Sequence, residues 1–248
     1  MKPTREIEYK FSGKVTVQDI ANLMDHSNLQ PQLTIQDTID CCTMAKKYKC
    51  ISCCVRPSDI EIAKKELDGT DIIITTVIGF PHGTCTTETK VFEAMDAIAK
   101  GADELDMVMN IGRMKSGDYD YVKKDIEAVA KVCHASGLKL KVILENAFLT
   151  EEEKIKACRI CDEAGADFTK TSTGYAPSGS KLEDLKLMRA NTRPDMQVKA
   201  AGGIRTLDDV LKIMATGTVR VGTRSTESIL EEAVKREKEG TLEIPSEV

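Results

Sequence analysis

Two lysines stand at positions that favour chemistry on a carbonyl group. Lys170 lies in the run Phe-Thr-Lys-Thr-Ser-Thr-Gly at 168–174, and Lys199 lies in the run Val-Lys-Ala-Ala-Gly-Gly at 198–203. Each run reads as an apolar β-strand that ends in small, flexible loop residues. A lysine that points inward at a strand end is desolvated, and burial or a second cation lowers its pKa toward the neutral, nucleophilic amine. The two lysines therefore predict amine chemistry on a carbonyl substrate.

The elements that position these lysines alternate along the chain of 248 residues. The strand candidates are 23–27, 50–56, 72–79, 104–109, 139–145, 167–171, 197–201 and 220–222. The helix candidates are 34–48, 58–67, 86–100, 119–135, 150–164, 181–190, 206–216 and 227–238. This order and length predict an α/β fold, a (β/α)₈ TIM barrel. An open, doubly wound sheet is the alternative, but it typically uses fewer strands.

The ends of the chain lie outside this repeat. Residues 15–22 predict a short extra N-terminal helix that closes the bottom of the barrel, after an N-terminal extension at 1–14. The polar tail at 239–248 predicts a loosely held segment. No Pro/Gly-rich linker interrupts the chain, so we expect a single TIM-barrel domain over 1–248.

Several helix candidates carry recognisable start and stop signals. Ser58 is followed three residues later by Glu61, and Thr150 precedes three acidic residues suited to a first helical turn. Glycines follow the predicted ends of four helices, at Gly101, Gly137, Gly165 and Gly217.

The composition excludes several function classes. A formal net charge of −5 argues against a nucleic-acid or anionic-membrane surface, where basic patches are expected. The first ten residues lack the apolar core of a signal peptide, and the run at 72–80 is too short to span a bilayer. The nine cysteines, with adjacent pairs at 41–42 and 53–54, do not resemble a secreted disulfide framework. We expect a cytoplasmic protein with no nucleic-acid or membrane partner.

Two Cys-x-x-Cys pairs raise the question of a metal site. Cys50 and Cys53 lie in a strand candidate, where residues three apart face opposite ways. Cys158 and Cys161 share one face of a helix candidate, and buried small hydrophobes describe all four better than zinc ligands. The chain has only three histidines, fewer than a metal hydrolase of this fold would use at its strand ends. We therefore predict no metal.

Polar residues end several of the predicted strands. Asp25, Cys54, Asp106, Lys170 and Lys199 are distant in sequence, yet a barrel gathers strand ends at one mouth, where active sites of this fold lie.

Alternation supports an inward position for Asp106. In the strand at 104–109, Asp106 shares its parity with Glu104 and Val108, whereas the Leu/Met/Met positions share the other face and suit packing against helices. A structural ion pair is the alternative role for Asp106.

These motifs together resemble one family. The chain is similar to the deoxyribose-phosphate aldolases, class I aldolases that reversibly join acetaldehyde to glyceraldehyde 3-phosphate. The similarity covers nearly the whole chain, and the matching runs are 24–26, 77–83, 101–108, 141–145, 165–174, 199–205 and 220–223.

The resemblance implies roles for the strand-end residues. Lys170 would form the Schiff base, the Lys199 ammonium would lower the pKa of Lys170, and Asp106 would work with Lys199 in proton transfer. The residues that would line the site and bind substrate hydroxyls or a water are Asp25, Ser27, Cys54 and Thr173. The implied substrate is a phosphorylated sugar, and the implied chemistry needs no cofactor.

The loops after the last strands predict a phosphate site. Glycines let backbone N–H groups approach a ligand, and the last helix begins directly after the loop at 222–225. The residues expected to form this site are Gly174, Gly202, Gly203, Gly222, Thr223, Arg224 and Ser225. Arg224 replaces a serine that is usual in the family, so it either grips the phosphate or points outward.

Other functions stay open at this point. A Schiff-base lyase of another specificity, such as a ketose aldolase or a transaldolase-like enzyme, would keep Lys170 but would not need Lys199 or Asp106. A catalytically silent phosphate-binding barrel would be expected to have lost one of these three residues. The family includes dimers and tetramers, so we expect a homo-oligomer.

Overall fold

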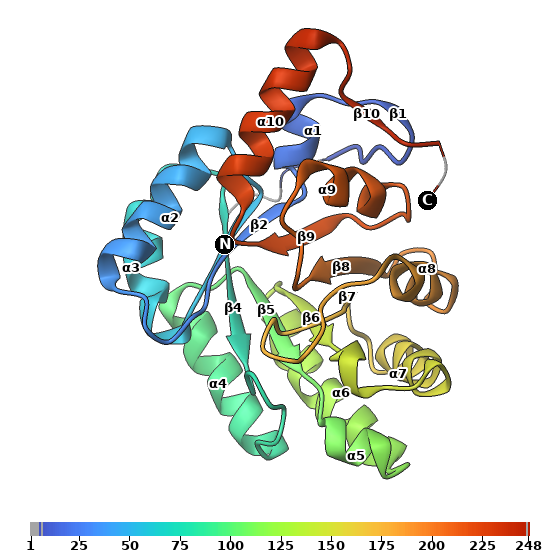
Figure 1. Cartoon of the computed structure of the whole chain (residues 1–248). Helices are drawn as coiled ribbons and strands as arrows, with labels where there is room; N and C mark the ends of the chain where they lie inside the picture. The colour runs from blue at the N-terminus through green and yellow to red at the C-terminus, as the bar shows by residue number, and fades with distance from the viewer. Residues whose placement is uncertain (1–4, 6, 247) are drawn as a thin grey trace.

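A computed structural model describes residues 5, 7–246 and 248, and its centre is a closed barrel of parallel strands in the order β2 to β9 (Figure 1). The strands are β2 (Met24–Asn28), β3 (Ser52–Val55), β4 (Ile73–Ile78), β5 (Glu104–Val108), β6 (Lys139–Ile143), β7 (Phe168–Lys170), β8 (Gln197–Ala201) and β9 (Arg220–Thr223). The predicted TIM barrel is therefore confirmed, with each strand within two residues of its expected ends.

Helices surround the barrel and connect its strands (Figure 1). The predicted ones are α1 (Val17–Ala21), α2 (Ile35–Tyr48), α3 (Ile60–Glu66), α4 (Thr87–Lys100), α6 (Tyr119–Ala135), α7 (Glu151–Glu163), α8 (Leu182–Ala190), α9 (Leu207–Met214) and α10 (Thr226–Glu239). Two short helical elements were not predicted, α5 (Ile111–Lys115) and η2 (Asn146–Phe148), and the turn η1 (Pro57–Asp59) overlaps the start of the helix predicted at 58–67. Among the described residues, no helix has both the length and the apolar character needed to cross a membrane.

The predicted start signal is confirmed at α7 and is wrong at α3. At α7 the Thr150 hydroxyl accepts from the Glu153 N–H at 3.2 Å, and the Glu153 carboxylate accepts from the Thr150 N–H at 2.8 Å. Ser58 does not cap α3, because the turn η1 precedes that helix and the Ser58 hydroxyl donates to the Asp59 carboxylate at 3.0 Å. The four predicted stop glycines all adopt positive φ.

Strand alternation separates an apolar layer from a charged interior. Leu105 and Met107 belong to the hydrophobic core between β5 and the helices, as their parity predicts. Glu104 and Asp106 are also buried, but they meet charged partners inside the barrel. In the part of the chain that the structure describes, no cysteine forms a disulfide. The four cysteines of the two Cys-x-x-Cys pairs are buried, as expected for small core residues.

The two ends of the chain form a small sheet of their own, which corrects the expectation of a loosely held tail at 239–248. β1 (Gly13–Lys14) pairs antiparallel with β10 (Glu243–Ile244) beside α1 and α10 (Figure 1). Leu242 and Ile244 are buried, with 3% and 4% of their surface exposed. Alternate apolar residues in an otherwise polar segment thus anchor it.

Candidate active site

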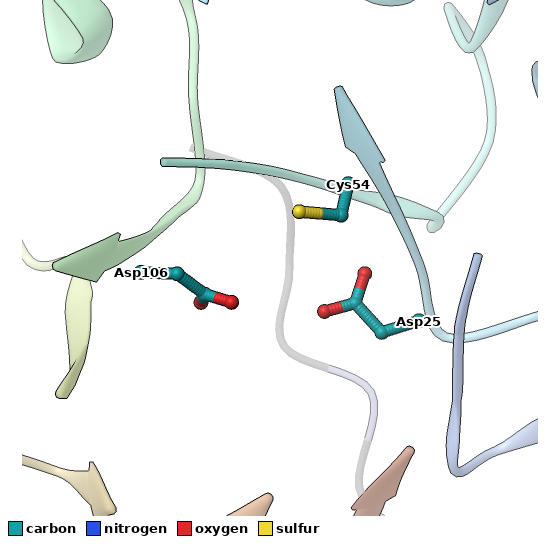
Figure 2. Close-up of side chains that lie close together, drawn as sticks. All are labelled: Asp25, Cys54 and Asp106. Carbon is teal, nitrogen blue, oxygen red and sulfur yellow. The ribbon is translucent and has the colours of Figure 1, made fainter. Parts of the chain in front are cut away.

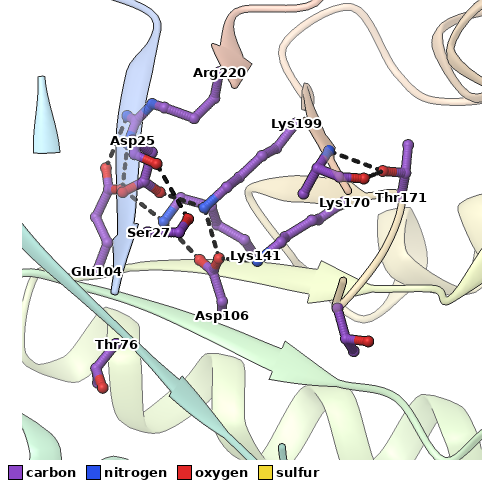
Figure 3. Close-up of polar contacts among 12 residues, drawn as sticks. Asp25, Ser27, Thr76, Glu104, Asp106, Lys141, Lys170, Thr171, Lys199 and Arg220 are labelled. Atoms are coloured by element: carbon purple, nitrogen blue, oxygen red, sulfur yellow. Dashed lines mark hydrogen bonds and ion pairs between the residues drawn. The ribbon is translucent and has the colours of Figure 1, made fainter. Parts of the chain in front are cut away.

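Three lysines surround the carboxylate of Asp106 inside the barrel (Figure 3). The Asp106 Oδ1 accepts from the Lys141 Nζ at 2.8 Å. Its Oδ2 accepts from the Lys170 Nζ at 2.7 Å and from the Lys199 Nζ at 2.6 Å. Lys170 and Lys199 therefore share a single carboxylate oxygen.

Strand register explains why these side chains meet. Asp106 on β5 is the register partner of Lys141 on β6, and Lys170 on β7 is the register partner of Lys199 on β8. Each of the four side chains points to the barrel axis, because successive residues of a strand alternate between its faces. All four are buried, and Lys170 keeps only 3% of its surface exposed. The barrel thus brings Asp106, Lys170 and Lys199 together as the sequence predicted.

The pKa values of the two lysines that share Asp106 are shifted in opposite directions. Burial lowers the pKa of Lys170, with Asp106 opposing this effect and the Lys199 charge adding to it. Burial also disfavours the charged form of Lys199, but the carboxylates of Asp106 and Asp25 outweigh it and raise the pKa of Lys199. Lys199 is therefore the ammonium of the pair, and Lys170 is the group closer to a neutral amine.

The carboxylate of Asp106 remains a charged partner of these lysines. Burial alone would raise the pKa of Asp106, but Lys141, Lys170 and Lys199 hold it well below the ordinary value. Asp25 on β2 forms a second, buried ion pair with Lys199. Lys199 is thus fixed between two carboxylates from opposite parts of the barrel.

Asp25, Cys54 and Asp106 converge on one another (Figure 2), and their possible ligand atoms lie within 4.8 Å. This donor set does not fit a metal ion. The Lys199 Nζ already bridges the two carboxylates, and it occupies the place that a cation would take. Burial raises the pKa of Cys54 to about 12, so its sulfur is a thiol and not the thiolate that metals prefer.

A cavity of about 340 Å³ opens above this cluster, at the carboxyl ends of the strands. A wider hollow of about 560 Å³, near Arg5 and Asp71, lies beside the amino ends of β2, β3 and β4, where no predicted site residue reaches. The predicted residues that line the smaller cavity are Ser27, Lys170, Thr173, Gly174, Gly202, Gly203, Gly222, Thr223, Arg224 and Ser225. Asp25, Cys54, Asp106 and Lys199 do not line it and lie buried beneath it. The smaller cavity is therefore the candidate active site, because the predicted site residues line it, and its volume suits a small ligand.

One wall of the cavity has the features of an anion cradle. Gly174, Gly202 and Gly203 adopt φ of 87°, 84° and 79°, a region that favours glycine. A Cβ on Gly202 would lie 3.0 Å from the Gly179 Cα, so the two loop backbones pass very close together. α10 begins at this wall, and its N-cap Ser225 makes no side-chain capping bond to the first turn. Its first N–H groups can therefore serve a bound anion.

Arg224 lies at the rim of the cavity and is exposed. Its Nη1 donates to the Gln30 Oε1 at 2.6 Å, and Gln30 lines the same cavity. A second rim arginine, Arg205, lines the same cavity and was not among the predicted site residues. Arg224 therefore remains within reach of a ligand and does not turn away from the site.

The sequence reasoning missed two buried site residues. Lys141 completes the cluster, and its inward parity on β6 was a signal that could have found it. Glu145 adopts a left-handed φ of 55° directly after β6, and its carboxylate accepts from the N–H and the hydroxyl of Thr173. Thr173, predicted to bind ligand, is thus also a partner of Glu145.

The histidines stay outside this chemistry. His26 is partly buried, its Nδ1 lies 3.0 Å from the Thr226 hydroxyl, and burial lowers its pKa to about 4. His82 and His134 are exposed.

Comparisons with known proteins agree on one family. A model of the DeoC/LacD family aldolases matches residues 19–223. A deoxyribose-phosphate aldolase of Thermococcus gammatolerans is 52% identical over 217 residues, 87% of this chain and 96% of that protein. One from Clostridium novyi is 50% identical over 208 residues, 84% of this chain and 93% of that protein. The solved deoxyribose phosphate aldolase of Aeropyrum pernix, described as a unique tetramer, matches with a TM-score of 0.80 at 28% identity, covering 88% of this chain and 92% of that one.

Proposed function

This chain belongs to the DeoC/LacD family of aldolases, and we propose that it reversibly cleaves 2-deoxy-D-ribose 5-phosphate to acetaldehyde and D-glyceraldehyde 3-phosphate. The observation that carries the proposal is one amine at the base of a cavity. Lys170 lines that cavity, its pKa is lowered, and it shares a carboxylate oxygen with a second lysine that stays charged. This is the arrangement that a Schiff-base aldolase needs.

Lys170 is the nucleophile of the proposed reaction. Its neutral amine adds to the C1 aldehyde of the open-chain sugar, and loss of water gives a protonated imine. The C3 hydroxyl then loses its proton, the bond between C2 and C3 breaks, and its electrons move into the imine. Glyceraldehyde 3-phosphate leaves, and an enamine stays on Lys170. Protonation of the enamine at C2 and addition of water release acetaldehyde and restore the amine.

Asp106 and Lys199 move the protons of these steps. The Lys199 ammonium lies on the same Asp106 oxygen as the Lys170 amine, so a proton has a short path between them, directly or through a water. The Lys199 ammonium supplies a proton when the carbinolamine hydroxyl leaves as water. The Asp106 carboxylate accepts a proton when the enamine forms. Asp25 keeps Lys199 charged and oriented. Ser27 and Thr173, which line the cavity, contact substrate hydroxyls or that water, and Cys54 lies buried beneath them.

The phosphate binds at the glycine-lined wall of the cavity. The glycine loops and the uncapped first turn of α10 offer backbone N–H donors, and Arg224 and Arg205 add positive charge at the rim. With the phosphate held there, the C1 aldehyde of the sugar extends toward Lys170, which lines the same cavity.

Borohydride trapping tests the proposed function. The protein is incubated with acetaldehyde or with deoxyribose 5-phosphate, reduced with borohydride, digested and analysed by peptide mass spectrometry. We expect one two-carbon reduced adduct, on Lys170, and production of acetaldehyde from the sugar phosphate without reduction. A folded protein that gives neither adduct nor acetaldehyde would contradict the proposal.

Arg224→Ser tests the phosphate wall. Loss of one charge-assisted contact is expected to raise the KM for deoxyribose 5-phosphate by about 3- to 10-fold, with kcat little changed. Turnover of unphosphorylated deoxyribose should not change, because it lacks the charged group. Steady-state kinetics on both sugars measure the difference. Arg113→Ser, at an exposed arginine that pairs with Asp118 on the surface, is the matched control. An unchanged KM in Arg224→Ser would place that arginine outside the phosphate site.

We also propose that the enzyme is a cytoplasmic homo-oligomer. The absence of disulfides among the described residues suits a reducing compartment, and a solved relative is described as a tetramer. Light scattering should give a mass that is two or four times the chain mass of 27.3 kDa. A mass equal to that of one chain would contradict this part of the proposal.

A further inference from the structure

A second charged layer lies beneath the reacting lysine (Figure 3). Arg220 on β9 donates to both carboxylate oxygens of Glu104, at 2.8 and 3.2 Å. The Lys141 Nζ lies 2.6 Å from the same carboxylate. Glu104 stands two residues before Asp106 on β5, so both point to the barrel axis one layer apart. Lys141 therefore joins the two layers by pairing with both carboxylates.

This lower layer is closed to water. Glu104, Lys141 and Arg220 are each at most 5% exposed. The fully buried ring of Phe168 lies 5.7 Å from the Lys141 Nζ and 5.5 Å from the Arg220 guanidinium. Tyr9 of the N-terminal extension lies beside Arg220 and covers it further. Charges in such an interior act on one another with little screening.

The titratable and charged groups around Lys170 come from most strands of the barrel. They are Asp25 on β2, Cys54 on β3, Glu104 and Asp106 on β5, Lys141 on β6, Glu145 after β6, Lys199 on β8 and Arg220 on β9. Arg220 and Lys141 hold the pKa of Glu104 at about 2 against the effect of burial, so Glu104 is an anion throughout the working range. Its charge therefore acts on Lys141, which also pairs with Asp106, the carboxylate that Lys170 contacts.

We propose that the Glu104–Arg220 pair is a positioning device, which fixes Lys141 against Asp106 from below and balances the charge that the reacting lysine experiences. The proposal rests on Lys170 being the nucleophile. Neither residue lines the cavity or touches the substrate. The pair acts through Lys141, which holds one Asp106 oxygen and leaves the other to Lys170 and Lys199.

Opposite charge changes in the pair test the proposal. Glu104→Gln removes a negative charge, disfavours the Lys170 ammonium and should move the acidic limb of the kcat/KM profile to lower pH. Arg220→Met removes a positive charge, favours that ammonium and should move the same limb to higher pH. Each shift should be on the order of one pH unit, because both charges lie in the same dry interior. A role limited to stability would not give shifts of opposite sign.

Charge-keeping variants are the controls, and a double variant covers the risk of misfolding. Glu104→Asp and Arg220→Lys should leave the limb in place. The double variant Glu104→Gln, Arg220→Met leaves neither charge unpaired, so it can fold where a single variant does not. Its limb should return to the wild-type pH, with a lower rate because Lys141 has lost a partner.

Two failures of this test can be told apart. If the wild-type protein gives no Lys170 adduct, the proposed function itself is wrong. If that adduct forms, two results would overturn the Glu104–Arg220 inference alone. One is that the single variants shift the acidic limb in the same direction or not at all. The other is that the acidic limb of the double variant lies about one pH unit from its wild-type position.

Discussion

Lys170→Leu is expected to lower turnover of deoxyribose 5-phosphate by at least about 10⁴-fold and to abolish the borohydride adduct. No other group in the cavity combines an amine, contact with the ligand space and a lowered pKa. The fold should survive the change, because Asp106 keeps its two other partners, Lys141 and Lys199. Coupled assay of acetaldehyde and intact-mass analysis after borohydride reduction measure the two effects.

Lys139→Leu is the matched control for this experiment. Lys139 is a half-buried lysine at the start of β6, and its Nζ lies 5.9 Å from the Phe168 ring without reaching the cavity. This variant should keep both turnover and the adduct. An adduct that persists in folded Lys170→Leu would reassign the nucleophile, with Lys199 and Lys141 as the next amines to examine.

The barrel could be predicted because its signal repeats along the chain. Apolar runs of strand length alternate with helical patterns, and glycines mark the ends of four of the helices. The remaining errors are local. The run at 50–56 extends beyond β3 because Cys50 and Ile51 are buried before the strand ladder begins, and burial looks the same on either side of that boundary.

The ends of the chain were harder to predict because their partners are remote in sequence. Leu242 and Ile244 alternate with polar residues, which is a weak strand signal in a short tail. Only the pairing of β10 with β1, more than 200 residues away, makes that signal meaningful.

The reacting side of the site could be predicted, and its support could not. Lys170 ends β7, and Lys199 and Asp106 lie within β8 and β5, two residues before the strand ends where this fold gathers its chemistry. Parity along the strands places Glu104 and Lys141 on the inward face, but their roles depend on which strands are neighbours. Only the register of β5 and β6 shows that each of these charges has a buried partner.

The orientation of the Arg224 side chain could not be predicted either. The sequence left open whether this arginine faces the ligand or the solvent, since a loop after a strand permits both. The side chain of Gln30, almost 200 residues earlier, decides the outcome by accepting a hydrogen bond from it.

Lys199→Leu is expected to slow turnover by about 10²- to 10⁴-fold and to move the acidic limb of the pH profile to higher pH. Lys199 is the charged neighbour that helps to lower the pKa of Lys170. Without it, Asp25 and Asp106 lose the cation between them, and the nearby Lys170 ammonium becomes more stable. A raised pKa leaves less neutral amine at neutral pH, so the sign of the shift follows directly. The pH dependence of kcat/KM and of the rate of adduct formation measures it.

Lys199→Arg separates the two roles that this lysine combines. Arginine keeps the positive charge, so the acidic limb should remain near its wild-type position. Arginine does not release a proton at these pH values, so the rate should still fall if Lys199 carries protons to the carbinolamine. A limb that stays in place in folded Lys199→Leu would refute the electrostatic coupling of the two lysines, whereas a full rate in Lys199→Arg would refute the proton transfer and leave Lys199 as a source of charge alone.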